Sequence, residues 1–243
     1  MATAFFRTFF SLPHIEPSPK RIRVLFGGKY IVDTTAARLV WTQKYYPYYY
    51  FPAEDLPKEY IHPAGAANEG ELQRYDLVVG SRKAEAAVSH HLVGDLAGLI
   101  NIEFSAVDAW FEEDEQIYQH PKDPYKRIEV LQSSRHIRIE LNGVVIAETR
   151  RPRLLFETSL RTRTYIPMTD CRLDLFAPSA LTTTCPYKGI ANYYSVRLPD
   201  GSILENSVWY YRTPLAECIE IKGLLAFYDE KLDVFVDDVL QPR

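Results

Sequence analysis

Six consecutive residues in the second half of the chain bring together a thiol, a phenol and an ammonium group. They run Thr184-Cys185-Pro186-Tyr187-Lys188-Gly189. The proline fixes a turn, and the glycine allows a ligand to approach the backbone closely. Lys188 is expected to bind an anionic group or, if it is removed from water, to act as a base. Tyr187 and Tyr193 would donate hydrogen bonds to an oxyanion or a carbonyl oxygen. The structural alternative is a rigid corner with a solvated lysine.

The thiol of Cys185 is a weaker candidate for a nucleophile. A catalytic thiolate needs a base, and the second half of the chain from residue 133 holds one histidine, His136. Cys171, Cys185 and Cys218 show no Cys-x-x-Cys spacing, so neither a disulfide framework nor a structural zinc site is indicated. We predict no metal, no cofactor and a reducing, cytoplasmic location.

Further polar and aromatic side chains are expected around the same cleft. Arg153 and Glu157 lie four residues apart on a predicted strand, so their side chains face the same way. A surface ion pair is an equal alternative for these two residues. The predicted catalytic residues are Lys188, Tyr187 and Asp170. The predicted ligand-binding residues are Arg153, Glu157, Tyr165, Cys185, Tyr193, Trp209 and Tyr211, with a core position as the alternative for Trp209.

An internal repeat sets the domain organisation. Arg21–Thr34 matches His136–Thr149 without a gap, and Val107–Phe111 matches Leu232–Val236 in the same order. We therefore predict an N-terminal arm at 1–19, a degenerate first module at 20–120, a linker at 121–132 and a second module at 133–243. Because so small a module buries little core alone, the two modules are expected to pack together as an internal pseudo-dimer.

Short alternating segments predict a mainly β fold in each module. Gly27-Gly28 and Asn142-Gly143 stand where a hairpin turn is expected between two alternating runs. A helical pattern is confined to Arg82–Leu96 and to a turn or two at Pro214–Ile221, where Pro214 suits a first helical position. The expected fold is a pair of tandem antiparallel modules with minor helix.

The composition excludes several classes of partner. The formal charge is -4, and no block of Lys and Arg indicates binding to nucleic acid. No apolar run approaches the roughly 20 residues of a membrane-spanning helix. Met1–Phe10 is apolar but contains only Arg7 as an early basic residue, which favours an arm packed on the body over a targeting segment.

The second module resembles the family catalogued as domain of unknown function 427. Its most specific stretch is Thr182–Val196, supported by Tyr165–Pro167 and Gly223–Tyr228. The resemblance covers both halves of the chain, but in the first half Asn68–Tyr75 stands where the Cys-Pro-Tyr-Lys-Gly block should be. It implies a β-tent-like domain, in which two antiparallel sheets lean together over a cleft. It implies no established activity, and the residues offer neither a glycine-rich phosphate loop nor the paired carboxylates of a nucleotidyltransferase.

Two functions follow as hypotheses. The first is a small-molecule-binding protein, in which the second-module cleft supports a metal-independent lyase, isomerase or cyclase reaction. The alternative is a non-catalytic scaffold module that binds a ligand or a protein. An enzyme should hold Lys188 or Asp170 in a closed pocket, whereas a binding module should present a shallow aromatic surface.

Overall fold

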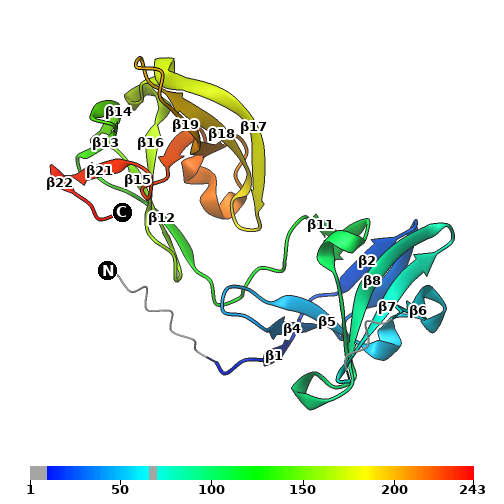
Figure 1. The fold of residues 1–243 in the computed structure, drawn as a ribbon. Helices are drawn as coiled ribbons and strands as arrows, with labels where there is room; N and C mark the ends of the chain where they lie inside the picture. The colour runs from blue at the N-terminus through cyan, green and yellow to red at the C-terminus, as the bar shows by residue number, and fades with distance from the viewer. Residues whose placement is uncertain (1–9, 66–69) are drawn as a thin grey trace. The chain divides into compact units, whose positions relative to one another are not determined.

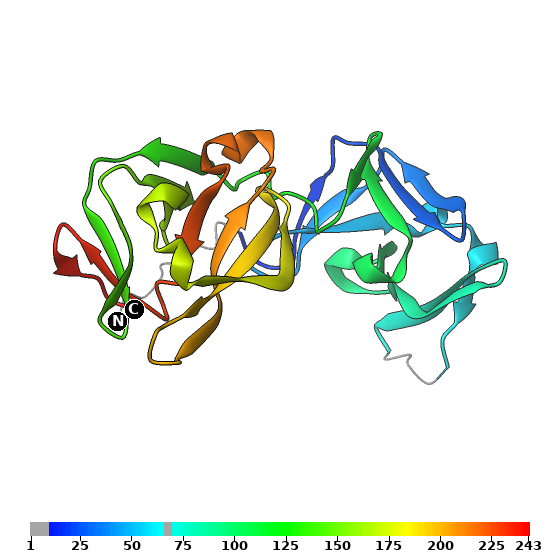
Figure 2. The same ribbon diagram turned by 90° about the horizontal axis from the view of Figure 1, so that it is seen from above.

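The described residues fold into two compact units, 10–124 and 125–243, called here the first and the second unit. The structure is a computed structural model that describes residues 10–65 and 70–243. Each unit contains one seven-stranded and one four-stranded antiparallel sheet (Figure 1, Figure 2). All helices in the described ranges are short 3-10 turns. The prediction of a mainly β chain with two tandem β-tent-like modules is confirmed.

In the first unit the seven-stranded sheet has the order β1-β4-β5-β9-β8-β7-β6, and the four-stranded sheet has the order β11-β10-β2-β3. The strands are β1 (His14–Pro17), β2 (Ile22–Phe26), β3 (Lys29–Thr34), β4 (Arg38–Trp41), β5 (Tyr48–Pro52), β6 (Ile61–Pro63), β7 (Leu72–Val79), β8 (Arg82–His91), β9 (Leu99–Ile102), β10 (Ala109–Glu112) and β11 (Glu115–Ile117). The 3-10 turns are η1 (Ala53–Asp55), η2 (Lys58–Tyr60), η3 (Gly94–Leu96) and η4 (Phe104–Ala106).

The second unit repeats this topology. Its sheets have the orders β12-β15-β16-β20-β19-β18-β17 and β14-β13-β21-β22. The strands are β12 (Ile128–Gln132), β13 (Ile137–Leu141), β14 (Val144–Thr149), β15 (Arg153–Glu157), β16 (Arg163–Pro167), β17 (Phe176–Cys185), β18 (Gly189–Arg197), β19 (Ile203–Tyr211), β20 (Leu224–Phe227), β21 (Asp233–Val236) and β22 (Val239–Leu240). The 3-10 turns are η5 (Met168–Asp170), η6 (Leu173–Leu175) and η7 (Ala216–Ile221).

The opening hairpin of each unit forms as its turn residues predict. Gly27 and Gly28 join β2 to β3 with φ of 57° and 76°, and Asn142 and Gly143 join β13 to β14 with φ of 52° and 77°. A two-residue hairpin turn of type I′ requires positive φ at both positions, which glycine and asparagine adopt most readily. The turn therefore sets the register of both repeats.

Each seven-stranded sheet has an inner face, which packs on the four-stranded sheet of its unit, and an outer face. In the second unit Ile139 and Ile146 of the small sheet join Ile166, Val208 and Leu225 of the large sheet in one buried cluster. The alternate residues of the large sheet point to the outer face. There Leu155, Tyr165 and Trp209 form a separate buried cluster with Cys218 and Ile221 of η7 (Figure 1, orange).

The predicted helix at Arg82–Leu96 is wrong. Residues 82–91 form β8, which pairs with β7 on one side and β9 on the other, and only η3 is helical. Its alanine, glutamate and lysine residues have good helix propensity. Pairing on both sides buries Ala87 and Val88 in the core, and this tertiary gain outweighs the local preference. The pattern at Pro214–Ile221 does give a short helical turn, η7.

Two strands lie outside the predicted module boundaries. β1 falls within the predicted arm, whose first nine residues are outside the described ranges, and β12 falls within the predicted linker. Both are edge strands, paired on one side with β4 and β15 respectively. Edge positions tolerate the proline and charged residues that made these segments look irregular. The packing of the two modules as a pseudo-dimer stays a prediction.

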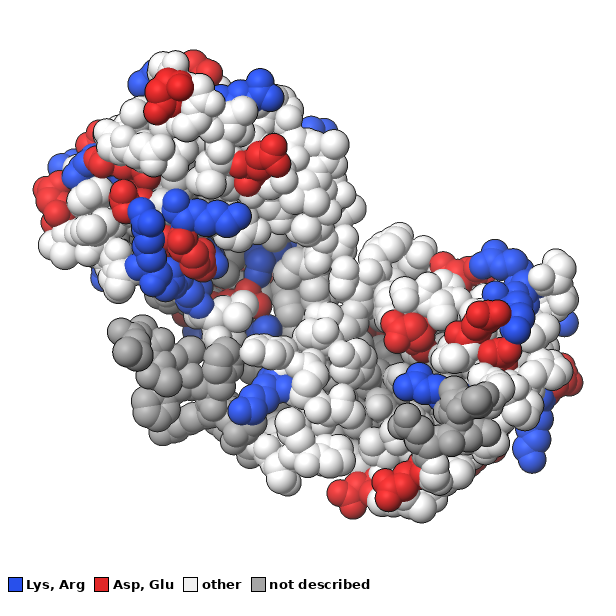
Figure 3. Space-filling view, viewed as in Figure 1, with Lys and Arg blue, Asp and Glu red and all other residues white. Residues whose placement is uncertain are grey.

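Surface charge is mixed. On the face drawn in Figure 3, acidic and basic side chains are intermingled over both units. Within the described ranges, no helix has the length and apolar composition needed to cross a membrane.

Asp170 ties η5 to the end of β14. Its carboxylate accepts hydrogen bonds from Thr149 Oγ1 at 2.7 Å and from Arg151 Nη2 at 2.7 Å. These contacts, the guanidinium of Arg151 first, lower the pKa of Asp170. In the first unit Ala36 takes the place of Arg151, and Oδ2 of Asp55 is buried without a hydrogen-bond partner among the described residues. The carboxylate of Asp170 therefore has a structural role, because it joins η5 to the end of β14.

We expect Asp170→Asn to lower the free energy of unfolding by about 1–3 kcal/mol, because it weakens hydrogen bonds to a charged group. The matched control is Asp174→Asn, which removes an ion pair with Arg172 that is exposed on both sides and should cost less than about 1 kcal/mol. Because the pKa of Asp170 is lowered in the folded state, its contribution is present above its ordinary value of 3.8 and is lost as the pH falls below it. Urea unfolding at pH 7 and pH 3 measures the free energy of unfolding of each variant and its dependence on pH. If Asp170→Asn and Asp174→Asn lowered this free energy equally, the structural role of Asp170 would be contradicted.

Candidate functional site

Lys188 lies in the turn that joins β17 to β18, where Cys185 pairs with Gly189. Gly189 has φ of 94°, and a Cβ atom there would stand 3.3 Å from the carbonyl oxygen of Thr213. The amide of Leu215 donates to the carbonyl oxygen of Lys188 at 3.2 Å. Glycine is thus needed at this position, because the segment that leads into η7 packs directly on the turn. That contact holds the backbone of Lys188 in place.

The ammonium group of Lys188 forms an ion pair with Oε2 of Glu157, at the end of β15. Lys126, just before β12, places its Nζ 3.3 Å from Oε1 of the same carboxylate. The exposed fractions of the side chains are 12% for Lys188, 6% for Glu157 and 15% for Lys126. Lys126 Nζ also lies 5.5 Å from the ring centre of the buried Tyr187. We call Lys126, Glu157 and Lys188 the Lys–Glu–Lys cluster.

A row of side chains crosses the outer face beside this cluster. Paired residues on neighbouring strands place Arg153, Tyr165, Ala226, Trp209 and Tyr193 next to one another in that order. Trp209 Nε1 donates to the hydroxyl of Tyr165 at 3.3 Å. The hydroxyl of Tyr193 shares a 2.7 Å hydrogen bond with Thr183. With Tyr165 at 1% and Trp209 at 8% exposure, this row is closely packed.

Burial favours the neutral forms of Tyr165, Tyr211 and Cys218 on the outer face. Burial is the main cause that raises the pKa of Tyr165 and of Tyr211, and the nearby Cys185 and Glu157 add to both shifts. Burial likewise raises the pKa of Cys218 to about 11, against the opposing charge of Lys188. The Tyr211 hydroxyl has no hydrogen-bond partner among the described residues. It is therefore a protonated donor next to a carboxylate, a thiol and two other phenols.

The structure brings together most of the residues predicted from the sequence. The Lys–Glu–Lys cluster and the adjoining outer face contain Tyr187, Lys188, Glu157, Tyr165, Cys185, Tyr193, Trp209 and Tyr211, and Arg153 lies on the same face. Asp170 is not among them, because it binds Thr149 and Arg151 at the small sheet.

Two residues of this region escaped the sequence analysis. Lys126 follows two prolines in the predicted linker, and only the pairing of β12 with β15 brings it to Glu157. Cys218 could have been found from the spacing of Leu215, Cys218 and Ile221, three residues apart, which places apolar side chains on one side of a short helix. Of these, Cys218 and Ile221 are fully buried.

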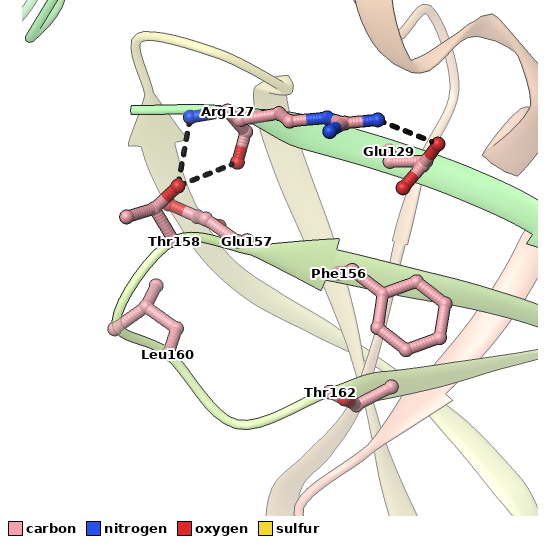
Figure 4. A pocket seen from close by; sticks show the side chains of 7 residues that line it. All are labelled: Arg127, Glu129, Phe156, Glu157, Thr158, Leu160 and Thr162. Atoms are coloured by element: carbon pink, nitrogen blue, oxygen red, sulfur yellow. Dashed lines mark hydrogen bonds and ion pairs between the residues drawn. The ribbon is translucent and has the colours of Figure 1, made fainter. Parts of the chain in front are cut away.

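A pocket of about 250 Å³ opens beside the cluster and includes Glu157 in its lining (Figure 4). Arg127 crosses one side of it and pairs with Glu129 at 2.9 Å. Phe156 and Leu160 supply apolar walls and are themselves partly exposed. Phe156 and Glu157 are neighbours on β15, so the phenyl ring and the carboxylate point to opposite faces of the strand, and the carboxylate is only 6% exposed. Within the described ranges, no group of three or more His, Cys, Asp or Glu side chains is placed to hold a metal ion.

The first unit has the same fold without this cluster. Arg38 and Tyr50 pair as Arg153 and Tyr165 do, so Thr42 occupies the position of Glu157. The β6–β7 connection corresponds to the turn that carries Lys188, and the predicted counterpart at Asn68–Tyr75 begins in residues outside the described ranges. The fold therefore forms without a carboxylate at this place.

Comparison with protein-family models gives one match in each half of the chain. The model described as a domain of unknown function (DUF427) matches residues 14–113 and 129–238. A comparison with curated protein sequences gives no significant match.

We expect Glu157→Gln to lower the free energy of unfolding by about 3–5 kcal/mol, because it leaves two poorly exposed ammonium groups without their carboxylate. Lys188→Met should cost less, since Glu157 keeps Lys126 as a partner. Glu129→Gln is the matched control, because its ion pair with Arg127 is exposed and should contribute less than about 1 kcal/mol. Chemical unfolding of the three variants measures the order of these losses in the free energy of unfolding. A loss in Glu157→Gln no greater than in Glu129→Gln would show that Glu157 does not bind the two lysines as described.

The thiols should differ in reactivity. Cys185 is half-buried, Cys218 is fully buried, and burial raises the pKa of Cys171 to about 12. Since the thiolate is the reactive form, iodoacetamide at pH 8 should label Cys185 first in the folded chain. Mass spectrometry of digested samples measures the labelling, with Cys185→Ser as the control. Early labelling of Cys218 would show that η7 does not cover the outer face as described.

Proposed function

Because this chain belongs to the family described as a domain of unknown function (DUF427), with one copy in each half, we propose a function for the copy that holds the charged cluster. The second unit binds a small anionic molecule at the Lys–Glu–Lys cluster. The observation that carries this proposal is that two ammonium groups share a single carboxylate while all three side chains are nearly buried.

The charge of the cluster favours an anion. Two cations and one carboxylate leave one positive charge in excess, in a place where little water can solvate it. A buried charge without a full set of partners is costly, so an anionic ligand that contacts both lysines would relieve that cost. Arg153 on the same face adds a half-buried guanidinium for which the described structure provides no ion pair.

The first unit supports a functional origin for the cluster. It folds with Thr42 in place of Glu157, so the fold does not need a buried carboxylate here. Replacing buried ion pairs by uncharged residues is often neutral for stability. A group of three charges that the fold does not require is better accounted for by ligand binding.

The neighbouring groups suit a polar ligand. Burial favours the protonated hydroxyl of Tyr211 at the edge of the cluster, and Tyr187 lies against Lys126. The open pocket in Figure 4 lies beside β15, the strand that carries Glu157. Small-molecule sites combine apolar walls with a few convergent polar groups in this way.

A metal-independent lyase, isomerase or cyclase reaction fits the same groups. The carboxylate of Glu157 would take a proton from a bound substrate, and the ammonium of Lys188 would stabilise the developing oxyanion. Asp170, which the sequence predicted to be catalytic, lies away from the cluster and takes no part in this reaction. The ammonium group of Lys188 is engaged in an ion pair with Glu157, so we assign it to anion binding rather than to action as a base.

A non-catalytic binding module is the second candidate. Tyr165, Trp209 and Tyr211 pack as a closed core rather than as an open reactive surface. In either case three free thiols fit a reducing compartment, and we place the protein in the cytoplasm with no nucleic-acid partner.

The test is ligand capture by the wild type, Lys188→Met and the exposed control Lys222→Met. Each purified full chain is examined by native mass spectrometry and by thermal shift against a panel of carboxylate and phosphate metabolites. We expect at least one anion to stabilise the wild type and the control, with at least tenfold weaker binding by Lys188→Met. Glu157→Lys, which adds positive charge, should bind no ligand that needs the carboxylate. An unresponsive wild type would support the scaffold function instead.

A further inference from the structure

The outer face of the seven-stranded sheet in the first unit carries a continuous row of polar side chains. Arg38 pairs with Tyr50, and Tyr50 pairs with Asn101. Asn101 then pairs with Ser89, and Ser89 pairs with Arg74. Directly opposed residues on antiparallel strands place their side chains on the same face, so these five lie side by side. We call them the polar row.

The polar row occupies the position of the aromatic row in the second unit. The shared pairing matches Ser89 to Trp209 and Asn101 to Ala226. It also matches Arg74 to Tyr193. Thus the two units keep an arginine and a tyrosine at one end of the row, while the other three positions change from apolar or aromatic to polar.

These three substitutions change the exposure of the outer face in the first unit. Trp209 and Ala226 are buried, whereas Ser89 and Asn101 are half-buried, because a serine leaves free the volume that the indole fills. The cover is smaller too: η3 spans Gly94–Leu96, whereas η7 spans Ala216–Ile221. At Ser89 and Asn101 the outer face of the first unit is therefore more accessible than the same face of the second unit, while Tyr50 is 6% exposed and packs with Leu96.

The polar row consists of hydrogen-bond donors. It runs from guanidinium through phenol, carboxamide and hydroxyl to a second guanidinium, and none of its five members carries a carboxylate. Arg38 is half-buried and forms no ion pair within the described part of the chain. His91 adds an imidazole 5.5 Å from the ring of Tyr50. Glu103, two residues after Asn101, and Asp95 of η3 are acidic residues near this face, and both side chains are exposed.

We propose that the polar row of the first unit binds an acceptor-rich anionic molecule, a carboxylate or a phosphate ester. Arg38 binds the anionic group with its paired N–H donors. Ser89 and one N–H of Asn101 donate to the remaining oxygens, while the other N–H of Asn101 donates to the carbonyl oxygen of Tyr49 at 3.0 Å. Neighbouring strands are about 4.8 Å apart, so the four side chains from Arg38 to Ser89 span about 14 Å. The site thus suits a ligand longer than a single inorganic anion.

This site is independent of the Lys–Glu–Lys cluster. It lies in the other unit and uses none of the same residues. It also gives the degenerate copy a function of its own, since loss of the Lys motif is accompanied by exchange of an apolar row for a donor row.

The test uses amide NMR spectra of the full chain, titrated with citrate and, separately, with inorganic phosphate. Three variants are compared with the wild type. Arg38→Met removes the guanidinium. Ser89→Trp with Asn101→Ala installs the residues of the second unit and so closes the row with side chains that this fold already accepts. Lys58→Met removes an exposed positive charge elsewhere in the same unit.

We expect saturable shifts of the Ser89 and Asn101 amides in the wild type and in Lys58→Met. The apparent affinity should fall at least tenfold in Arg38→Met and in the double variant, while their remaining amide signals stay dispersed. Tighter binding of citrate than of phosphate would identify a carboxylate ligand, and the reverse a phosphate ester. Absent or unsaturable shifts with both probes, or equal affinity in Arg38→Met, would overturn the proposal.

Discussion

Each seven-stranded sheet has two faces, but the four-stranded sheet of its unit covers only one of them. The uncovered face must be hidden by other elements or made compatible with water, because exposed apolar area is unfavourable. The two units solve this problem differently. The second unit packs aromatic side chains and η7 on its outer face, while the first leaves a shorter cover and a row of polar groups. Both proposed sites follow from this difference.

At the edge of the outer face in the second unit, the contacts are ion pairs rather than apolar packing. Glu157 ends β15, and the turn carrying Lys188 and the segment carrying Lys126 meet on its carboxylate. A single buried carboxylate thus joins three segments that are far apart in the sequence. The arrangement holds one cation more than it needs for neutrality, and this excess charge is the basis of the proposal that the cluster binds an anion.

The sequence was sufficient where local signals decide the structure. Positive φ at Gly27-Gly28 and Asn142-Gly143 follows from residue type, and the ungapped repeat gives two copies of one fold. The motif around Lys188 predicted the turn between β17 and β18, because glycine and proline mark that turn. Sequence reasoning failed where long-range pairing decides. Arg82–His91 has the composition of a helix but is held between two strands, and Lys126 reaches Glu157 only through the pairing of β12.

The most direct measurement is the anomalous difference map of a crystal of the full chain soaked in bromide. If the Lys–Glu–Lys cluster is an anion receptor, a bromide peak should lie within contact distance of Lys126 or Lys188 Nζ. The corresponding place beside Thr42 in the first unit should show none. Bromide peaks at other surface cations, with the cluster empty, would contradict the central claim and leave the three charges as a purely structural tie.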